Sequence, residues 1–194
     1  VASNAKPPIA TLLHLDEAQR RDTEGNIRAA IDRLRYFQLG NGGFSYWPGG
    51  SSARSANDGY SLWATTYASH FLIEAEKAGY AVPASMRAGM IRSLRTTAQD
   101  WRASQGSPLD QAYRLYVLAR AGQPELGAMN RLRETTGLQN TERWVLAATY
   151  QLSGLRDVAR SLTPSDAMST RSYRGRDYTF GSVLRDRAMI LQSM

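Results

Sequence analysis

The side chains that carry most protein chemistry are scarce in this sequence of 194 residues. It has no cysteine, which excludes disulfide bonds, thiolate metal sites and a cysteine nucleophile. Its only histidines are His14 and His70, and no HExxH pattern brings two of them together to bind zinc. We therefore predict no metal site and no cofactor.

His70 lies on a strongly apolar helical pattern, seven residues after Trp63. At that place an imidazole could act as a general base or as a switch near neutral pH. A hydrogen-bonded histidine of the core or of an interface is the interpretation that we favour.

The carboxylates and serines do not form a recognisable catalytic set. The acids Asp16–Glu17 and Glu74/Glu76 are pairs only along the chain, because neighbouring side chains on a helix diverge, and we expect them to be solvated. The GxSxG turn of serine hydrolases is missing around Ser45, Ser61 and Ser69. We assign no catalytic residue and expect that the chain is not an enzyme.

The formal net charge of +7 comes from 24 basic against 17 acidic residues. The excess is diffuse, since the arginines run from Arg20 to Arg187. The densest basic and aromatic segment, 171–178, could bind phosphate or RNA, but acidic residues flank it and no nucleic-acid-binding module surrounds it. We expect a solvated or interdomain loop there and no nucleic-acid partner. No apolar run anywhere in the 194 residues approaches the length of about 18 that a membrane-spanning helix needs, so we expect no direct membrane contact by this chain.

Apolar periodicity predicts a series of helices separated by glycine or proline. Thr23 is the expected N-cap of the first, in which apolar residues recur at helical spacing from Ile27 to Phe37. Residues 1–22 are expected to be an irregular lead or the tail of a helix that starts before Val1. Further helices are predicted at 59–78, 83–101, 108–121, 124–133, 144–152, 155–162 and 183–194.

The predicted helices alternate in character. The helix at 59–78 is apolar over most of its circumference, which is typical of an inner helix, whereas the helix before it is amphipathic like an outer one. Such pairs recur about every 35–45 residues, which favours stacked helical hairpins in a solenoid or a closed α/α toroid. We therefore predict an all-α fold in which residues 23–194 form a single domain, part or all of an α/α toroid.

Several segments resemble the thioester domain of bacterial alpha-2-macroglobulins. The more specific pair is QLGNGGFSYWPGG at 38–50 and WATTYASHFLIEAEKAGY at 63–80. The segments at 111–133 and 180–191 are similar to later helices of that domain, in the family's order. The resemblance covers residues 27–194.

The resemblance implies an α/α-toroid domain in a large periplasmic peptidase inhibitor that acts by entrapment and is often an inner-membrane lipoprotein. The segment would then be a scaffold, whose partners are the other domains of the parent chain and, through the parent, target proteases. Family members with a Cys-x-Glu-Gln motif form an internal thioester, whereas this chain has no cysteine and no Glu-Gln pair. Either the motif lies before Val1, which we favour, or the chain belongs to a branch without a thioester.

The glycine-rich segment 38–47 is also similar to the Gln-Trp motif of terpene cyclases and to the glycine-aromatic turns of prenyltransferases, which share the toroid. In each, glycines permit a tight turn, an aromatic ring stacks over a helix end and the glutamine amide caps it. We therefore assign a structural role to the family-motif residues Gln38, Gly42, Gly43, Phe44, Trp47, Trp63 and Tyr67. The alternatives are a helical-repeat adaptor and a toroid enzyme of the terpene-cyclase or glycan-lyase type, whose DxDD or zinc-binding motifs are missing.

Overall fold

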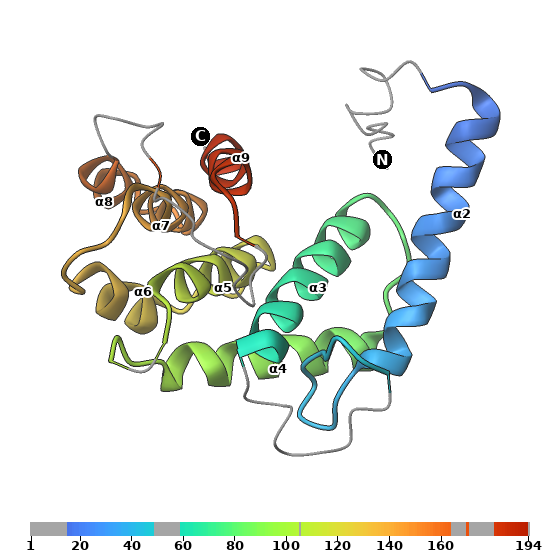
Figure 1. Cartoon of the computed structure of the whole chain (residues 1–194), viewed down its shortest axis with the longest axis horizontal. Helices are drawn as coiled ribbons and strands as arrows, with labels where there is room; N and C mark the ends of the chain where they lie inside the picture. Colours follow the sequence, from blue (N-terminus) through green and yellow to red (C-terminus); the bar gives the residue numbers. More distant parts are fainter. Residues whose placement is uncertain (1–14, 49–58, 105, 164–169, 171–180, 194) are drawn as a thin grey trace.

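The computed structural model describes residues 15–48, 59–104, 106–163, 170 and 181–193 (Figure 1). In these parts the chain consists of helices joined by turns, which confirms the predicted all-α class. No helix within them is both long and apolar enough to cross a membrane. The elements are, in chain order, α2 (Glu17–Leu34), the 3-10 helix η1 (Arg35–Phe37), α3 (Gly59–Lys77), α4 (Ala84–Asp100), α5 (Pro108–Arg120), α6 (Leu126–Arg133), α7 (Asn140–Leu152), α8 (Arg156–Leu162) and α9 (Val183–Ser193).

The helices form two rows along an arc. In the inner row, α3 packs on α5, α5 on α7 and α7 on α9. In the outer row, α4 lies against α3 and α5, α6 against α5 and α7, and α8 against α7. α2 packs on α3 at one end of the arc, while α8 and α9 lie at the other end (Figure 1). The chain therefore runs as successive helical hairpins, as the spacing of its glycines and prolines predicts.

The inner helices α3, α5 and α7 end in the same way. Each is followed by a glycine with positive φ: 92° at Gly79, 74° at Gly122 and 82° at Gly154. In each case the N–H of the next residue donates to a carbonyl five residues earlier, at 2.9 to 3.0 Å. This Schellman ending turns the chain out of the inner helix and towards the next helix of the outer row.

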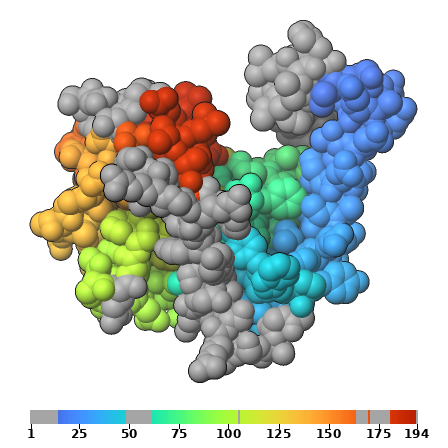
Figure 2. Space-filling model, viewed as in Figure 1, coloured from blue at the N-terminus to red at the C-terminus, as the bar shows by residue number. Residues whose placement is uncertain are grey.

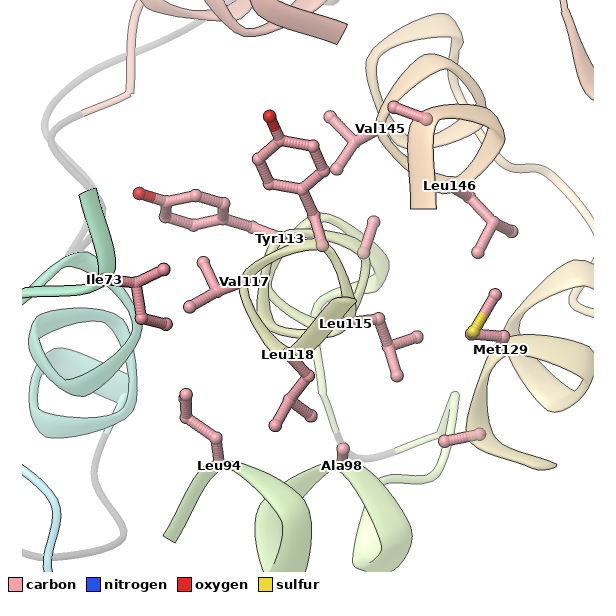
Figure 3. Close-up of a cluster of buried hydrophobic side chains, with 14 of the residues drawn as sticks. Ile73, Leu94, Ala98, Tyr113, Leu115, Val117, Leu118, Met129, Val145 and Leu146 are labelled. Carbon is pink, nitrogen blue, oxygen red and sulfur yellow. The ribbon is translucent and has the colours of Figure 1, made fainter. Parts of the chain in front are cut away.

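The central inner helix, α5, is the middle of the core (Figure 3). Every residue in 109–119 is buried, because α3, α4, α6 and α7 all pack against this helix. Figure 3 shows Leu118 pointing towards Leu94 of α4, and Leu115 pointing towards Met129 of α6. Side chains of α5 therefore pack against helices of both the inner and the outer row.

The first helix, α2, begins earlier than its apolar pattern predicts. The Asp16 carboxylate accepts a hydrogen bond from the Gln19 N–H at 2.8 Å, and the Gln19 side chain accepts one from the Asp16 N–H at 3.0 Å. This capping box makes residues 17–22 helical rather than irregular, and Thr23 lies inside the helix instead of at its N-cap. These first turns are exposed, so they carry no apolar signal. The rest of the expected lead, 1–14, lies outside the described residues.

The last helix, α9, leaves large apolar side chains in solvent. Leu184 is 78% exposed and Leu191 is 74% exposed, and a spacing of seven residues places them on one face of the helix. Ile190, on another side of the same helix, is fully buried, and α9 packs on α7. Figure 2 shows α9 at the surface of the molecule. Among the described helices, α9 is the member of the inner row that no outer helix follows.

We expect the 194-residue chain on its own to self-associate through this face of α9. Sedimentation velocity should detect species heavier than the monomer. The double substitution Leu184→Ser and Leu191→Ser should shift the distribution to monomer, because it removes exposed apolar surface without altering the core. Leu126→Ser, which changes a half-exposed leucine of α6, is the matched control and should leave the distribution unchanged. A wild-type chain that is monodisperse as a monomer would contradict this expectation.

Candidate functional site

The motif that carries the resemblance forms a short hairpin over residues 37–45. The Ser45 N–H donates to the Phe37 carbonyl at 3.1 Å, and Gln38 pairs with Phe44 in an isolated antiparallel bridge. The hairpin thus directly follows η1 and lies between α2 and α3 in the chain.

The Gln38 side chain fastens this hairpin to α4. Its Nε2 donates to the Gly42 carbonyl and to the Met86 carbonyl, both at 3.1 Å. Met86 lies in the first turn of α4, where the groups without helical partners are N–H groups and not carbonyls. The amide therefore bridges the turn of the hairpin to α4 and does not cap a helix end, which corrects the role that the sequence predicted.

Two glycines let the backbone of the hairpin approach its neighbours closely. Gly42 has a φ of 88°, and a Cβ there would overlap the backbone of Gly89 in α4. A Cβ on Gly89 would in turn lie 3.2 Å from the Gly42 Cα, and a Cβ on Gly43 would lie 2.8 Å from the Thr65 Oγ1. The sequence did not single out Gly89, which completes the close contact between the hairpin and α4.

Phe44 and Thr65 attach the hairpin to α3. Phe44 is almost fully buried, and its N–H donates to the Thr65 Oγ1 at 2.8 Å. The Thr65 hydroxyl donates back to the Phe44 carbonyl at 3.2 Å. One buried threonine side chain therefore satisfies both backbone polar groups of a buried residue, as burial requires.

The tryptophans and the tyrosine of the motif differ in their surroundings. Trp63 is buried in α3, with its ring centroid 5.3 Å from that of Tyr113 in α5. Trp47 is 78% exposed and Tyr67 is 66% exposed. Tyr67 is exposed, although the helix at 59–78 was predicted to be an inner one, because α2, α4 and α5 do not cover the whole circumference of α3.

His70 lies between the inner helices α3 and α5, as a hydrogen-bonded core histidine would. Its Nδ1 is 2.9 Å from the Tyr113 hydroxyl, and its ring meets those of Tyr113 and Tyr116 edge to face. Its Nε2 is 3.9 Å from the Glu74 carboxylate, too far for a hydrogen bond. Burial lowers the pKa of His70, although the charge of Glu74 opposes that shift.

Close to His70, an ion pair joins the inner helices α3 and α5. Arg120 of α5 binds Glu74 of α3 through Nε at 2.9 Å and Nη2 at 2.6 Å, and Lys77 lies 3.5 Å from the same carboxylate. Burial alone would raise the pKa of Glu74, but the hydrogen bond and charge of Arg120 outweigh it and lower that pKa. A two-pronged guanidinium contact of this kind fixes geometry as well as charge.

The lowered pKa of His70 predicts a loss of stability in mild acid. The folded protein holds this imidazole neutral below its ordinary pKa of 6.5, whereas the unfolded chain binds a proton there. The free energy of unfolding should therefore be flat above pH 6.5 and fall as the pH drops from 6.5 through the lowered pKa. Urea unfolding between pH 5 and 8 measures this slope.

The variant that tests this prediction is His70→Gln, which should flatten the slope below pH 6.5. An NMR titration of the His70 imidazole that gave a pKa at or above 6.5 would contradict the prediction.

A buried polar group ties α9 to the rest of the inner row. The fully buried Asp186 accepts from the Arg185 guanidinium at 2.8 Å and from the Thr141 hydroxyl of α7 at 3.5 Å. The same guanidinium lies over the Trp63 ring, 5.0 Å from its centroid. These contacts join α9 to α7 and to α3, and they connect residues that are distant in sequence.

Some sequence-based assignments lie outside the described residues, namely His14 and the basic segment 171–178. Over the parts that the structure describes, no group of three or more histidine, cysteine, aspartate or glutamate side chains is placed to hold a metal ion. The chemistry that the described site displays is hydrogen bonding and packing within the chain.

No protein-family model matches the chain, and no curated protein matches its sequence. Solved structures do match it. The native conformation of Escherichia coli alpha-2-macroglobulin is 22% identical over 98% of this chain, with a TM-score of 0.71. The native E. coli protein from domain MG7 to the C-terminus gives the same identity and coverage, with a TM-score of 0.74. Salmonella alpha-2-macroglobulin reacted with methylamine is 27% identical over 86% of this chain, with a TM-score of 0.68. The chain has the fold of a segment of the bacterial alpha-2-macroglobulins.

This match confirms the resemblance found in the sequence. The alpha-2-macroglobulin-like segment spans only 12%, 31% and 11% of those three matched chains, respectively. The matched structures also include E. coli alpha-2-macroglobulin activated by trypsin and by porcine elastase. A fold similar to that of this chain is therefore found as a part of longer proteins.

Proposed function

We propose that this chain is the scaffold of the thioester domain of an alpha-2-macroglobulin-like protein. Such a protein is a broad-range peptidase inhibitor that acts by entrapment. The observation that carries the proposal is the similarity of fold over almost the whole chain to E. coli alpha-2-macroglobulin. The parent protein would be periplasmic and anchored to the inner membrane as a lipoprotein. The segment itself would hold other parts of the parent in place and would not be an enzyme.

The geometry of the hairpin supports a scaffold role. Both N–H groups of the Gln38 amide are used inside the molecule, on the hairpin and on α4. The Thr65 hydroxyl is likewise occupied by the backbone of Phe44. A motif whose polar groups bind one another fixes the positions of α3 and α4 and leaves those groups unavailable to a ligand.

The thioester requires a residue that this sequence does not contain. Because the chain has no cysteine, a thioester would have to form from other parts of the parent protein. Methylamine opens a thioester by aminolysis and frees one thiol for each bond opened. We expect one thiol per molecule when the full-length protein is treated with methylamine, with a matching mass change in the thioester peptide. Absence of thiol would assign the parent to a branch without the bond.

Entrapment itself has a distinctive readout. The full-length protein is incubated with trypsin, and hydrolysis of a small peptide substrate is compared with digestion of a large protein substrate. We expect the first activity to persist and the second to disappear, because an enclosed protease still admits small molecules. Equal loss of both would indicate a direct active-site inhibitor, and retention of both would contradict the proposed function.

One structural feature could serve as the substrate site of the alternative, a toroid enzyme. A cleft of about 790 Å³ lies beside the hairpin, and its lining includes Asn41, Ser93, Thr97, Trp101 and Arg114. Sugars and diphosphates are bound by such polar and aromatic side chains. Reproducible thermal stabilisation of the full-length protein by several degrees with an oligosaccharide or a diphosphate would favour the enzyme and overturn the scaffold proposal.

A further inference from the structure

The hairpin combines a locked interior with two exposed aromatic side chains. Tyr36 is 74% exposed, just before the first arm of the hairpin, and Trp47 is 78% exposed, just after the second arm. Large aromatic residues bury extensive apolar surface when they are covered, so leaving two of them in water is unfavourable. The hydrogen bonds that hold the hairpin do not involve these two side chains, so small polar residues at the same positions would leave those bonds intact.

The register of the hairpin places these two residues at the same end. The Ser45 N–H donates to the Phe37 carbonyl, so the flanking residues emerge together at the open end, away from the glycine turn. The arms cannot separate easily, because Gln38 is bonded to α4 and Phe44 is bonded to α3. Tyr36 and Trp47 therefore project from a rigid support.

Rigid, exposed tyrosine and tryptophan side chains are the usual anchors of protein interfaces, since little conformational entropy is lost when they are covered. Two exposed arginines precede Tyr36 closely in the chain, Arg33 and Arg35, of which Arg35 pairs with the exposed Asp32 at 3.5 Å. Arginine is the third residue type enriched at such anchors. The composition and rigidity of this end of the hairpin fit a protein surface that is apolar at its centre and has an acidic group at its edge, within reach of Arg33.

We propose that Tyr36 and Trp47 form a docking face for another domain of the same polypeptide. This inference rests on the proposed function, in which the chain is one part of a longer protein. The matched E. coli structure supports that occupant, because the region similar to this chain makes up only 12% of it. A partner domain in the same polypeptide is also held near the face at high effective concentration, so two anchors and a small contact area suffice.

The test is site-specific photo-crosslinking in the full-length protein. Trp47 is replaced by benzoylphenylalanine, the protein is irradiated, and crosslinked peptides are identified by mass spectrometry. We expect a crosslink from position 47 to a peptide of the same polypeptide outside these 194 residues. Tyr36→Ser should lower the yield of that crosslink several-fold, whereas Tyr67→Ser, the matched change at the remaining exposed aromatic of the described chain, should leave the yield unchanged.

Three results would overturn the docking face: crosslinks confined to the 194 residues, crosslinks to a second copy, and crosslinks to an unrelated protein. Mixing isotopically light and heavy protein before irradiation separates the second copy from the same polypeptide. The trypsin entrapment assay on the unsubstituted protein is run in parallel. A protein that fails to entrap trypsin but forms the expected crosslink would remove the proposed function and leave the docking face standing.

Discussion

Gly42→Ala is expected to lower the free energy of unfolding by about 2 to 5 kcal/mol. Two costs add. A residue with a side chain is strained by about 1 to 2 kcal/mol at the positive φ of Gly42. The new Cβ would also overlap the backbone of Gly89, which cannot rotate away as the end of a side chain can. Urea or thermal unfolding of the chain measures the loss.

Alanine substitutions at two other glycines distinguish the backbone strain from the steric overlap. Gly79 has a similar φ of 92°, but no atom lies within 4 Å of its Cβ position, so Gly79→Ala should show the backbone strain alone. Gly40 has neither a positive φ nor a close neighbour, so Gly40→Ala should change stability little. Equal losses for Gly42→Ala and Gly79→Ala would contradict the contact between the hairpin and α4.

The sequence predicted the helices well wherever an apolar stripe coincided with a glycine or proline stop. The end of α5 at Gly122 and its N-cap at Ser107 are examples, because both signals are local. The start of α2 was placed too late, since its first turns are solvated and only the capping box of Asp16 and Gln19 marks them. An acidic or hydroxylated N-cap three residues before a glutamine was the available signal.

The site was less predictable because its contacts join residues that are distant in sequence. Gln38 and Gly42 could be identified from the motif, but their partners Met86 and Gly89 lie on α4, more than forty residues later. The exposure of Tyr67 could not be read from its helical spacing either. Spacing gives the face on which a residue lies, whereas exposure depends on which neighbouring helix covers that face.

Leu118→Ala is expected to lower the free energy of unfolding by about 2 to 5 kcal/mol, because this fully buried side chain would leave a cavity that its neighbours cannot fill. Leu118 projects from α5, which four other helices enclose, so collapse of the cavity would require the inner and outer rows to move together (Figure 3). Leu126→Ala, at a half-exposed position of α6, should cost no more than about 0.5 kcal/mol. Leu118→Met conserves volume and should cost less than about 1.5 kcal/mol. Urea unfolding compares the three, and a loss below that of Leu126→Ala would show that α5 is not enclosed on its α4 side.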